Sequence, residues 1–261
     1  MTDNTALPSL PSPNSDSSDE HAVDIGRIEV LLDAGVVSRP QNAALWGSNY
    51  AVLVSVKDDN LEAMAVYKPR RGERPLWDFP DGTLCYREYL SYRVSKALGW
   101  YLVPPTALRN GPHGLGSVQI FIEHDPQVNY FNLDDRFIDQ LQRFAIFDYL
   151  VNNTDRKGGH LLLDLHGRLW GIDHGLTFHP TPKLRTVIWE FAGQHVPASL
   201  LDAVCKLSEQ LESPASELRQ LFDTWLTQNE TSALLRRIHH LLEIRNFPNP
   251  GPGPNHPWPP I

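Results

Sequence analysis

The spacing of apolar residues changes along the chain, from a strand-like pattern in the first half to a helix-like pattern in the second. Apolar runs of strand length occupy residues 50–57, 61–69 and 118–123. Turn-forming residues at 58–60 separate the first two runs, which predicts a β-hairpin. The stretch 84–98 has helical spacing and is followed by Gly99, so a helix is expected there.

In the second half, helical spacing dominates. Apolar positions recur with a helical period over 136–152, which is the strongest helix pattern of the chain. Three further helices are expected at 200–211, 214–228 and 232–244, and Ser213 and Thr231 are the expected N-caps of the last two. Strands followed by helices predict an α+β protein in two lobes.

A second hairpin lies between the long helix and the C-terminal helices. Its strands are expected at 160–165 and 168–172. The hairpin brings Asp155, in the polar loop before it, and Asp173, directly after it, to the same end of a small sheet. Two such acids suit phosphoryl transfer, in which one accepts the proton of the acceptor hydroxyl and the other holds a metal that bridges the phosphates.

These segments resemble those of a known superfamily. The run NNTDRKGGH followed by GIDHG is similar to the catalytic and metal-binding loops of phosphatidylinositol 3-/4-kinases, especially type II phosphatidylinositol 4-kinases and HipA-type bacterial kinases. The segments YKPRRGERPLWDFPDGTL and EYLSYRVSKALGWYLVPPT resemble a family of kinase-like proteins from actinobacteria and chloroflexi. The resemblance implies a protein-kinase-like fold with a sheet-rich N-lobe at 25–124, a helical C-lobe at 125–245 and a nucleotide cleft between them.

The resemblance also implies roles for individual residues. Lys68 becomes the strand lysine that contacts the α- and β-phosphates of ATP, and Glu88 the helix acid that pairs with it. Asp155 becomes the acid that activates the acceptor, with Arg156 beside it, and Asp173 the metal ligand. A turn over the phosphates is implied at Gly47, Ser48 and Asn49. A strand near the hinge that binds adenine is implied at Gln119, Ile120, Phe121 and Ile122.

His160 departs from the pattern of the superfamily. Five residues after the catalytic Asp, these kinases usually carry an Asn that serves as the second metal ligand, whereas this chain has His160. An imidazole is a poor ligand for Mg²⁺ and a better one for Mn²⁺. His160 is therefore either a metal ligand that shifts the preference toward Mn²⁺ or only a spacer.

Each of these residues also has a purely structural alternative. Lys68 and Glu88 taken singly fit solvated surface charges, and Asp155 and Asp173 taken singly fit turn positions. Arg156 either neutralises charge beside the catalytic acid or forms a structural ion pair. The occurrence of the four residues in the required order favours the kinase interpretation.

The composition limits the partners and the cellular compartment that we expect for this protein. The net charge is −8, with several acids in the Ser/Pro-rich segment 1–24, and no basic patch indicates a nucleic-acid partner. Two cysteines support neither a disulfide framework nor a four-cysteine zinc site, which fits a reducing cytoplasm, and no apolar run is long enough for a transmembrane helix. We expect disordered tails at 1–24 and at the Pro/Gly-rich segment 246–261, the latter offering Trp258 for possible partner contacts.

The sequence thus predicts an ATP-dependent phosphotransferase that uses Mg²⁺ or Mn²⁺. The acceptor hydroxyl belongs to a protein, a small molecule or a lipid. Two alternatives stay open, a nucleotide-binding pseudokinase with a regulatory role and a kinase-like enzyme that transfers AMP.

Overall fold

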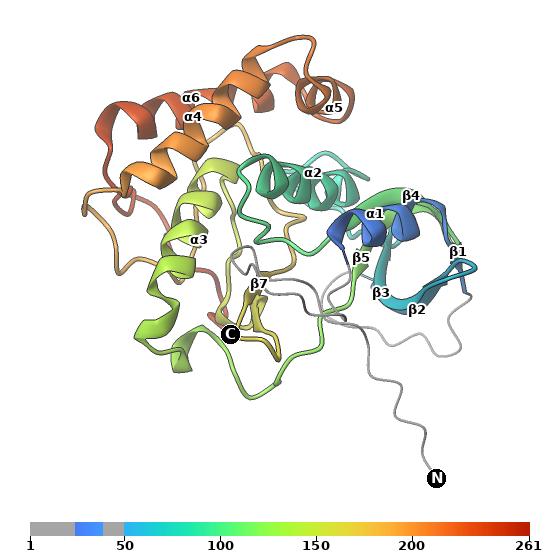
Figure 1. Ribbon diagram of the computed structural model, residues 1–261. Coiled ribbons are helices and arrows are strands. Elements are labelled where there is room, and N and C mark those ends of the chain that lie inside the picture. Colours follow the sequence, from blue (N-terminus) through green and yellow to red (C-terminus); the bar gives the residue numbers. More distant parts are fainter. Residues whose placement is uncertain (1–23, 39–49) are drawn as a thin grey trace.

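The computed structural model describes residues 24–38 and 50–261, which form a two-lobed α+β structure (Figure 1). One lobe contains a five-stranded antiparallel sheet in the order β1-β2-β3-β5-β4 with helix α1 packed against it. The elements are α1 (Ile25–Ala34), β1 (Val36–Val37), β2 (Val52–Lys57), β3 (Glu62–Pro69), β4 (Thr106–Gly111) and β5 (Gly114–Ile120). The hairpin expected from the first two apolar runs is β2 and β3.

The other lobe is mainly helical. It contains α3 (Ile138–Val151), α4 (Ala198–Glu212), α5 (Glu217–Trp225), α6 (Gln228–Ile244) and the small hairpin β6 (Leu161–Leu163) with β7 (Leu169–Gly171). Helix α2 (Leu84–Ala97) lies between this lobe and the sheet (Figure 1). Short 3₁₀ turns cover Arg70–Gly72, Tyr130–Asn132, Asp135–Phe137 and Gly158–His160.

The core of the sheet lobe follows from alternation along its strands. In β2, Val52, Val54 and Val56 point inward, because successive strand residues face opposite sides. The apolar face of α1 covers them with residues such as Leu31. Sequence analysis missed α1, although Asp24 marks its start: the Asp24 side chain accepts a hydrogen bond from the Gly26 N–H at 3.0 Å.

Helix α2 contacts β4 and β5 of the sheet on one side and contributes to the core of the helical lobe on the other. Leu90, Tyr92 and Val94 are at most 1% exposed and belong to the same apolar cluster as α3 and α6. Arg87 forms a buried ion pair with Glu230 of α6 at 2.5 Å and donates to the Thr177 carbonyl at 2.7 Å. The helix that faces the sheet is thus fastened to the opposite lobe.

Two predicted helix starts are wrong. Helix α5 begins after Ser216, whose side chain accepts from the Arg219 N–H, and not after Ser213. Helix α6 begins after Thr227, which forms a capping box with Glu230, and Thr231 lies inside the helix. The capping box satisfies two free N–H groups, so it determines the helix start more strongly than Thr231 does.

The segment 246–261 is not the frayed tail that its composition predicts. It packs along the helical lobe and ends beside the hairpin β6–β7 (Figure 1). The side chain of Phe247 is 2% exposed, and Pro257 is buried. Prolines lack an N–H donor, so the segment is attached mainly through its carbonyl groups, which accept hydrogen bonds from the lobe.

Candidate active site

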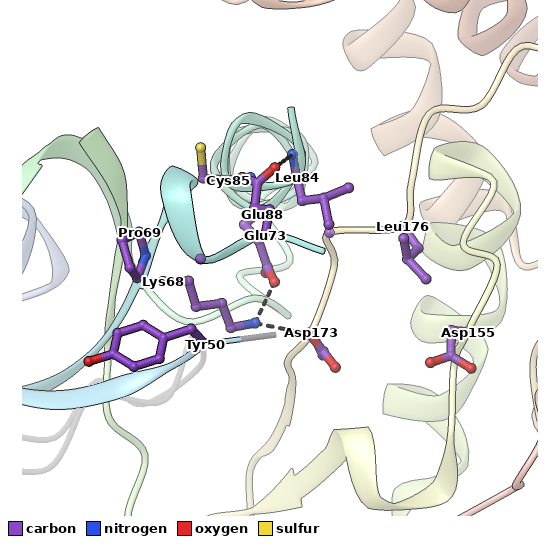
Figure 2. A pocket seen from close by; sticks show the side chains of 12 residues that line it. Tyr50, Lys68, Pro69, Glu73, Leu84, Cys85, Glu88, Asp155, Asp173 and Leu176 are labelled. Carbon is purple, nitrogen blue, oxygen red and sulfur yellow. Dashed lines mark hydrogen bonds and ion pairs between the residues drawn. The ribbon is translucent and has the colours of Figure 1, made fainter. Parts of the chain in front are cut away.

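A cleft between the two lobes brings together four of the residues that the sequence singles out, Lys68, Glu88, Asp155 and Asp173. It encloses about 530 Å³, counting its open side. Figure 2 shows Lys68 and Tyr50 on the sheet side, with Asp173 and Asp155 facing them from the helical lobe. The cleft is lined by Tyr50, Lys68, Pro69, Gly72, Glu73, Leu84, Cys85, Glu88, Asp155, Asp173, Gly175 and Leu176.

The Lys68 ammonium is held by two carboxylates. Its Nζ lies 2.5 Å from Glu88 Oε1 and 3.0 Å from Asp173 Oδ1 (Figure 2). Although burial favours the neutral amine, Asp173 and Glu88 hold the pKa of Lys68 above its usual value. Lys68 is therefore a fixed positive charge in the cleft, which suits the binding of phosphate groups.

Glu88 connects three elements through one carboxylate. Oε1 accepts from Lys68 of β3, and Oε2 accepts from the backbone N–H of His174 at 3.0 Å. The Glu88 side chain itself comes from α2, and the residue is 3% exposed. The predicted pairing of Lys68 with Glu88 is present, and the same carboxylate also orients the turn that follows Asp173.

Asp173 occupies a turn with unusual backbone geometry. Its φ angle is 61°, in the left-handed region that non-glycine residues rarely adopt, although Asp tolerates it better than most. Its side chain is half exposed, next to Lys68 and His160. The Lys68 ammonium holds the pKa of Asp173 well below its usual range, so this carboxylate is ionised at neutral pH.

Asp155 lies in the loop between α3 and β6. Its backbone N–H donates to the side chain of Asn153 at 3.0 Å, a turn that starts directly after the helix. Burial raises the pKa of Asp155 to about 6, against the opposing effect of Lys157. A carboxylate of this kind is ionised near neutral pH and more basic than an exposed one, which suits proton acceptance.

Lys157 is a residue of the Asp155 loop that the sequence analysis did not single out. Its Nζ lies 3.5 Å from Asp155 Oδ2, and its side chain is mostly buried. It places a positive charge directly beside Asp155. The available signal was its position two residues after Asp155, which places it in the same loop.

The fit of a divalent metal can be tested on the side chains near Asp173. Among the described residues, no three His, Cys, Asp or Glu side chains gather closely enough to hold an ion alone. His160 Nε2 lies 3.5 Å from Asp173 Oδ2, and burial lowers the pKa of His160 to about 4. The neutral imidazole and the carboxylate would offer two ligands to a divalent ion, which would then need further oxygen ligands from the nucleotide or from water.

The Arg156 side chain does not reach the cleft. Its side chain is fully buried and pairs with Asp148 of α3 at 2.9 Å. It also donates to the carbonyls of His160 and Ile172, and lies 2.5 Å from His174 Nε2. Of the two alternatives for Arg156, the structure favours the structural ion pair, because every contact of its guanidinium is within the lobe framework.

Asn152 and Asn153 hold the loop of Asp155 through side-chain hydrogen bonds, a role that the sequence analysis did not assign. Asn152 ends α3 with φ 51°, and its amide donates to the carbonyls of His179 and Thr181. Asn153 donates to Asp148 at 3.0 Å. The two asparagines therefore tie the loop of Asp155 to the segment after Asp173 and to α3.

The remaining predicted residues lie away from the cleft or outside the described residues. Gln119 and Ile120 end β5, Phe121 donates its N–H to the Met64 carbonyl at 2.9 Å, and Ile122 is buried. None of the four lines the cleft as the described residues define it. Their place at an adenine hinge stays a prediction. Gly47, Ser48 and Asn49 lie outside the described residues.

Comparisons with known proteins concern the family and the fold of this chain. The family model described as phosphatidylinositol 3- and 4-kinase matches residues 108–235. Protein Rv2133c of Mycobacterium tuberculosis is 36% identical over 280 residues, which cover 92% of this chain and 95% of that protein. The structure of hydra Fam20 with sugar has a TM-score of 0.53 at 15% identity and covers 90% of this chain and 91% of its own. A Helicobacter pylori proinflammatory kinase, CtkA, has a TM-score of 0.49 at 13% identity, over 83% of this chain and 94% of its own.

The two lobes and the cleft with its lysine–glutamate pair define a protein of the kinase-like class. Within that class, the chain belongs to the same family as protein Rv2133c, and its residues 108–235 match the phosphatidylinositol 3- and 4-kinase model. No helix in the described part of the chain has the length and apolar character needed to cross a membrane.

Proposed function

We propose that this protein is an ATP-dependent phosphotransferase that transfers the γ-phosphoryl group to a hydroxyl of a protein, small-molecule or lipid acceptor. The observation that carries the proposal is the meeting of the Lys68–Glu88 pair with Asp173 and Asp155 in one cleft. Kinases need these parts, a phosphate-binding cation, a metal-binding acid and an acid near the acceptor.

On the nucleotide side, Lys68 binds the α- and β-phosphates and Glu88 keeps its ammonium in place. Asp173 and His160 would hold Mg²⁺ or Mn²⁺. When bound, the metal–ATP complex supplies the phosphoryl group and the charge that neutralises its oxygens.

On the acceptor side, Asp155 orients the hydroxyl and accepts its proton as the oxygen bonds to the γ-phosphorus and the bond to ADP breaks. Its raised pKa favours this step, since a stronger base near neutral pH accepts a proton more readily. Lys157, 3.5 Å from Asp155, compensates negative charge on the group in transfer.

The test is ATP turnover with Mg²⁺ or Mn²⁺, in the presence of a native metabolite extract. Asp155→Asn and Asp173→Asn should each lower turnover by about 10²- to 10⁴-fold, because each removes a group that acts in the transfer. Asp202→Asn, at an exposed position of α4, serves as the matched control and should leave turnover unchanged.

Mass spectrometry of the protein and the extract identifies the group transferred. A gain of phosphate supports the proposal, and a gain of AMP indicates adenylyl transfer instead. Tight nucleotide binding without any consumption of ATP indicates a regulatory pseudokinase, and the proposal then fails.

A further inference from the structure

The C-terminal segment 246–261 runs along the helical lobe and is anchored at three places. The first anchor is Phe247, next to the end of α6. Its N–H donates to the Gln194 carbonyl at 2.9 Å, and its carbonyl accepts from the Gly193 N–H at 3.0 Å. Its ring packs against Phe191 at a centroid distance of 5.4 Å. This anchor fixes where the segment begins.

The second anchor is the backbone carbonyl of Asn255. It accepts hydrogen bonds from the Thr186 N–H at 3.0 Å and from Trp189 Nε1 at 3.1 Å. The Asn255 side chain donates to the Gly251 carbonyl at 2.8 Å, which closes a turn before the anchor. The segment thereby holds the stretch around Thr186 from outside.

The stretch around Thr186 in turn holds the loop of Asp155. The Arg156 N–H donates to the Arg185 carbonyl at 3.0 Å, and the Arg156 carbonyl accepts from the Val187 N–H at 3.2 Å. Arg156 directly follows Asp155. The second anchor therefore supports the backbone next to Asp155 indirectly. It holds the stretch around Thr186, which pairs with Arg156 like a neighbouring strand.

The third anchor acts on that loop directly. The Pro260 carbonyl accepts from the Gly158 N–H at 2.8 Å. On the other side of the same peptide unit, the Lys157 carbonyl accepts from the His160 N–H at 3.1 Å. The peptide between Lys157 and Gly158 is thus held on both sides, midway between Asp155 and His160.

Gly158 leaves room for this contact because it has no side chain. A Cβ at this position would lie 2.7 Å from the Phe131 ring and 3.5 Å from the Pro260 oxygen. The last residues of the chain, the ring of Phe131 and the loop therefore pack against one another, so displacement of the C-terminal residues frees the Gly158 amide.

The composition of segment 246–261, which we call the strap, suits its attachment to the lobe. Seven of its sixteen residues are proline. Proline fixes φ and lacks an N–H, so the unbound segment has few conformations to lose and offers mainly carbonyl acceptors. It meets a lobe surface that presents N–H donors at Thr186, Trp189 and Gly158.

We propose that the segment 246–261 is a positioning element of the active site, which holds the loop of Asp155 through the carbonyls of Asn255 and Pro260. This inference rests on the proposed phosphotransferase function. Because Lys68 and Glu88 hold the nucleotide from β3 and α2, loss of the strap should lower kcat and leave ATP affinity nearly unchanged.

The first experiment uses a chain that ends at Pro257, so the Phe247 and Asn255 anchors stay and the Pro260 carbonyl is lost. Hydrogen exchange of the Gly158 amide, followed by NMR, should accelerate by about tenfold or more, because its hydrogen bond is removed. ATP turnover should fall by about tenfold while the Kd for ATP changes less than about twofold. Pro252→Ala, at an exposed position of the same segment, is the control and should change none of the three.

The second experiment tests rescue in trans. A chain that ends at Phe247 is mixed with a synthetic peptide of residues 248–261. Slow exchange at Gly158 and turnover should both recover with saturation, whereas a peptide of residues 248–257 should restore neither. A purely structural tail would change thermal stability without this dependence on the last four residues.

The outcomes separate the two proposals. Wild-type exchange at Gly158 together with wild-type turnover in the chain ending at Pro257 overturns the positioning role. If the full-length protein consumes no ATP, the proposed function fails, while the exchange rate at Gly158 still decides whether the strap holds the loop.

Discussion

Two pairs of neighbouring residues in the same motifs have opposite surroundings. Asp155 and Asp173 face the cleft, with side chains 27% and 50% exposed, whereas Arg156 and His174, the next residues in the chain, are fully buried. The acids therefore meet solvent and ligands, and their neighbours do not. One residue of each pair is available for chemistry, and the other belongs to the framework.

The buried pair explains how the exposed pair is held. Arg156 bonds to Asp148 of α3 and lies 2.5 Å from His174 Nε2. Burial lowers the pKa of His174, so its imidazole is neutral and accepts from the guanidinium. One side chain thus joins the loop of Asp155 to the turn of Asp173. The spacing between the two acids therefore depends on an ion pair that neither acid touches.

The largest expected effect comes from breaking the buried framework. Arg156→Met leaves the Asp148 carboxylate without its buried partner, so we expect a loss of about 3 to 5 kcal/mol in the free energy of unfolding. Urea denaturation followed by circular dichroism measures it. Arg136→Met is the control, because Arg136 pairs with Asp134 at the surface. Equal stability of both variants would contradict a framework role for Arg156.

A smaller effect is expected from the pH dependence of the exposed pair. Burial raises the pKa of Asp155 to about 6, and only the ionised form accepts a proton. Turnover should therefore rise with pH through about 6 and fall by about tenfold per pH unit below it. ATP affinity measured at each pH separates this effect from binding. The Asp155→Asn variant should lose the inflection, and an inflection that persists there would assign it to another group.

The smallest expected effect concerns the metal. If His160 is a ligand, its neutral nitrogen favours Mn²⁺ over Mg²⁺, and His160→Asn should reduce that preference severalfold by supplying an oxygen. Nucleotide affinity in each metal measures it. Both polar contacts of the His160 imidazole, from Nε2 to Asp173 and from the Lys157 N–H to Nδ1, are 3.5 Å long. An unchanged metal ranking would make His160 a spacer.

Much of the fold and the cleft could be predicted from the sequence because the relevant signals are local. Apolar alternation located β2 and β3, and the hairpin β6–β7 placed Asp155 and Asp173 at one end of a small sheet. Lys68, one residue before the end of β3, could be placed because its segment resembles the strand lysine of known kinases.

The features that could not be predicted from the sequence depend on contacts between distant residues. The burial of Arg156 follows from Asp148 facing inward on α3, which a periodic pattern does not distinguish from an exposed acid. Segment 246–261 has a disordered composition, and only the donors on the facing lobe make it ordered. The polar strand β4 (Thr106–Gly111) was missed because its pattern shows little alternation, although it pairs along the whole edge of β5.

The attachment of α2 has a consequence for control of the protein. Many kinases are turned on and off by a swing of the helix that carries the acid paired to the strand lysine. Here that helix also carries Arg87, whose buried bond to Glu230 would have to break first, and Tyr86, whose ring stacks on Trp225 at 4.4 Å. Removing one partner of such a buried pair costs about 3 to 5 kcal/mol, so the arrangement in which Glu88 pairs with Lys68 is strongly favoured. We therefore expect that activity is not controlled by a swing of α2 in this protein, in contrast to many kinases.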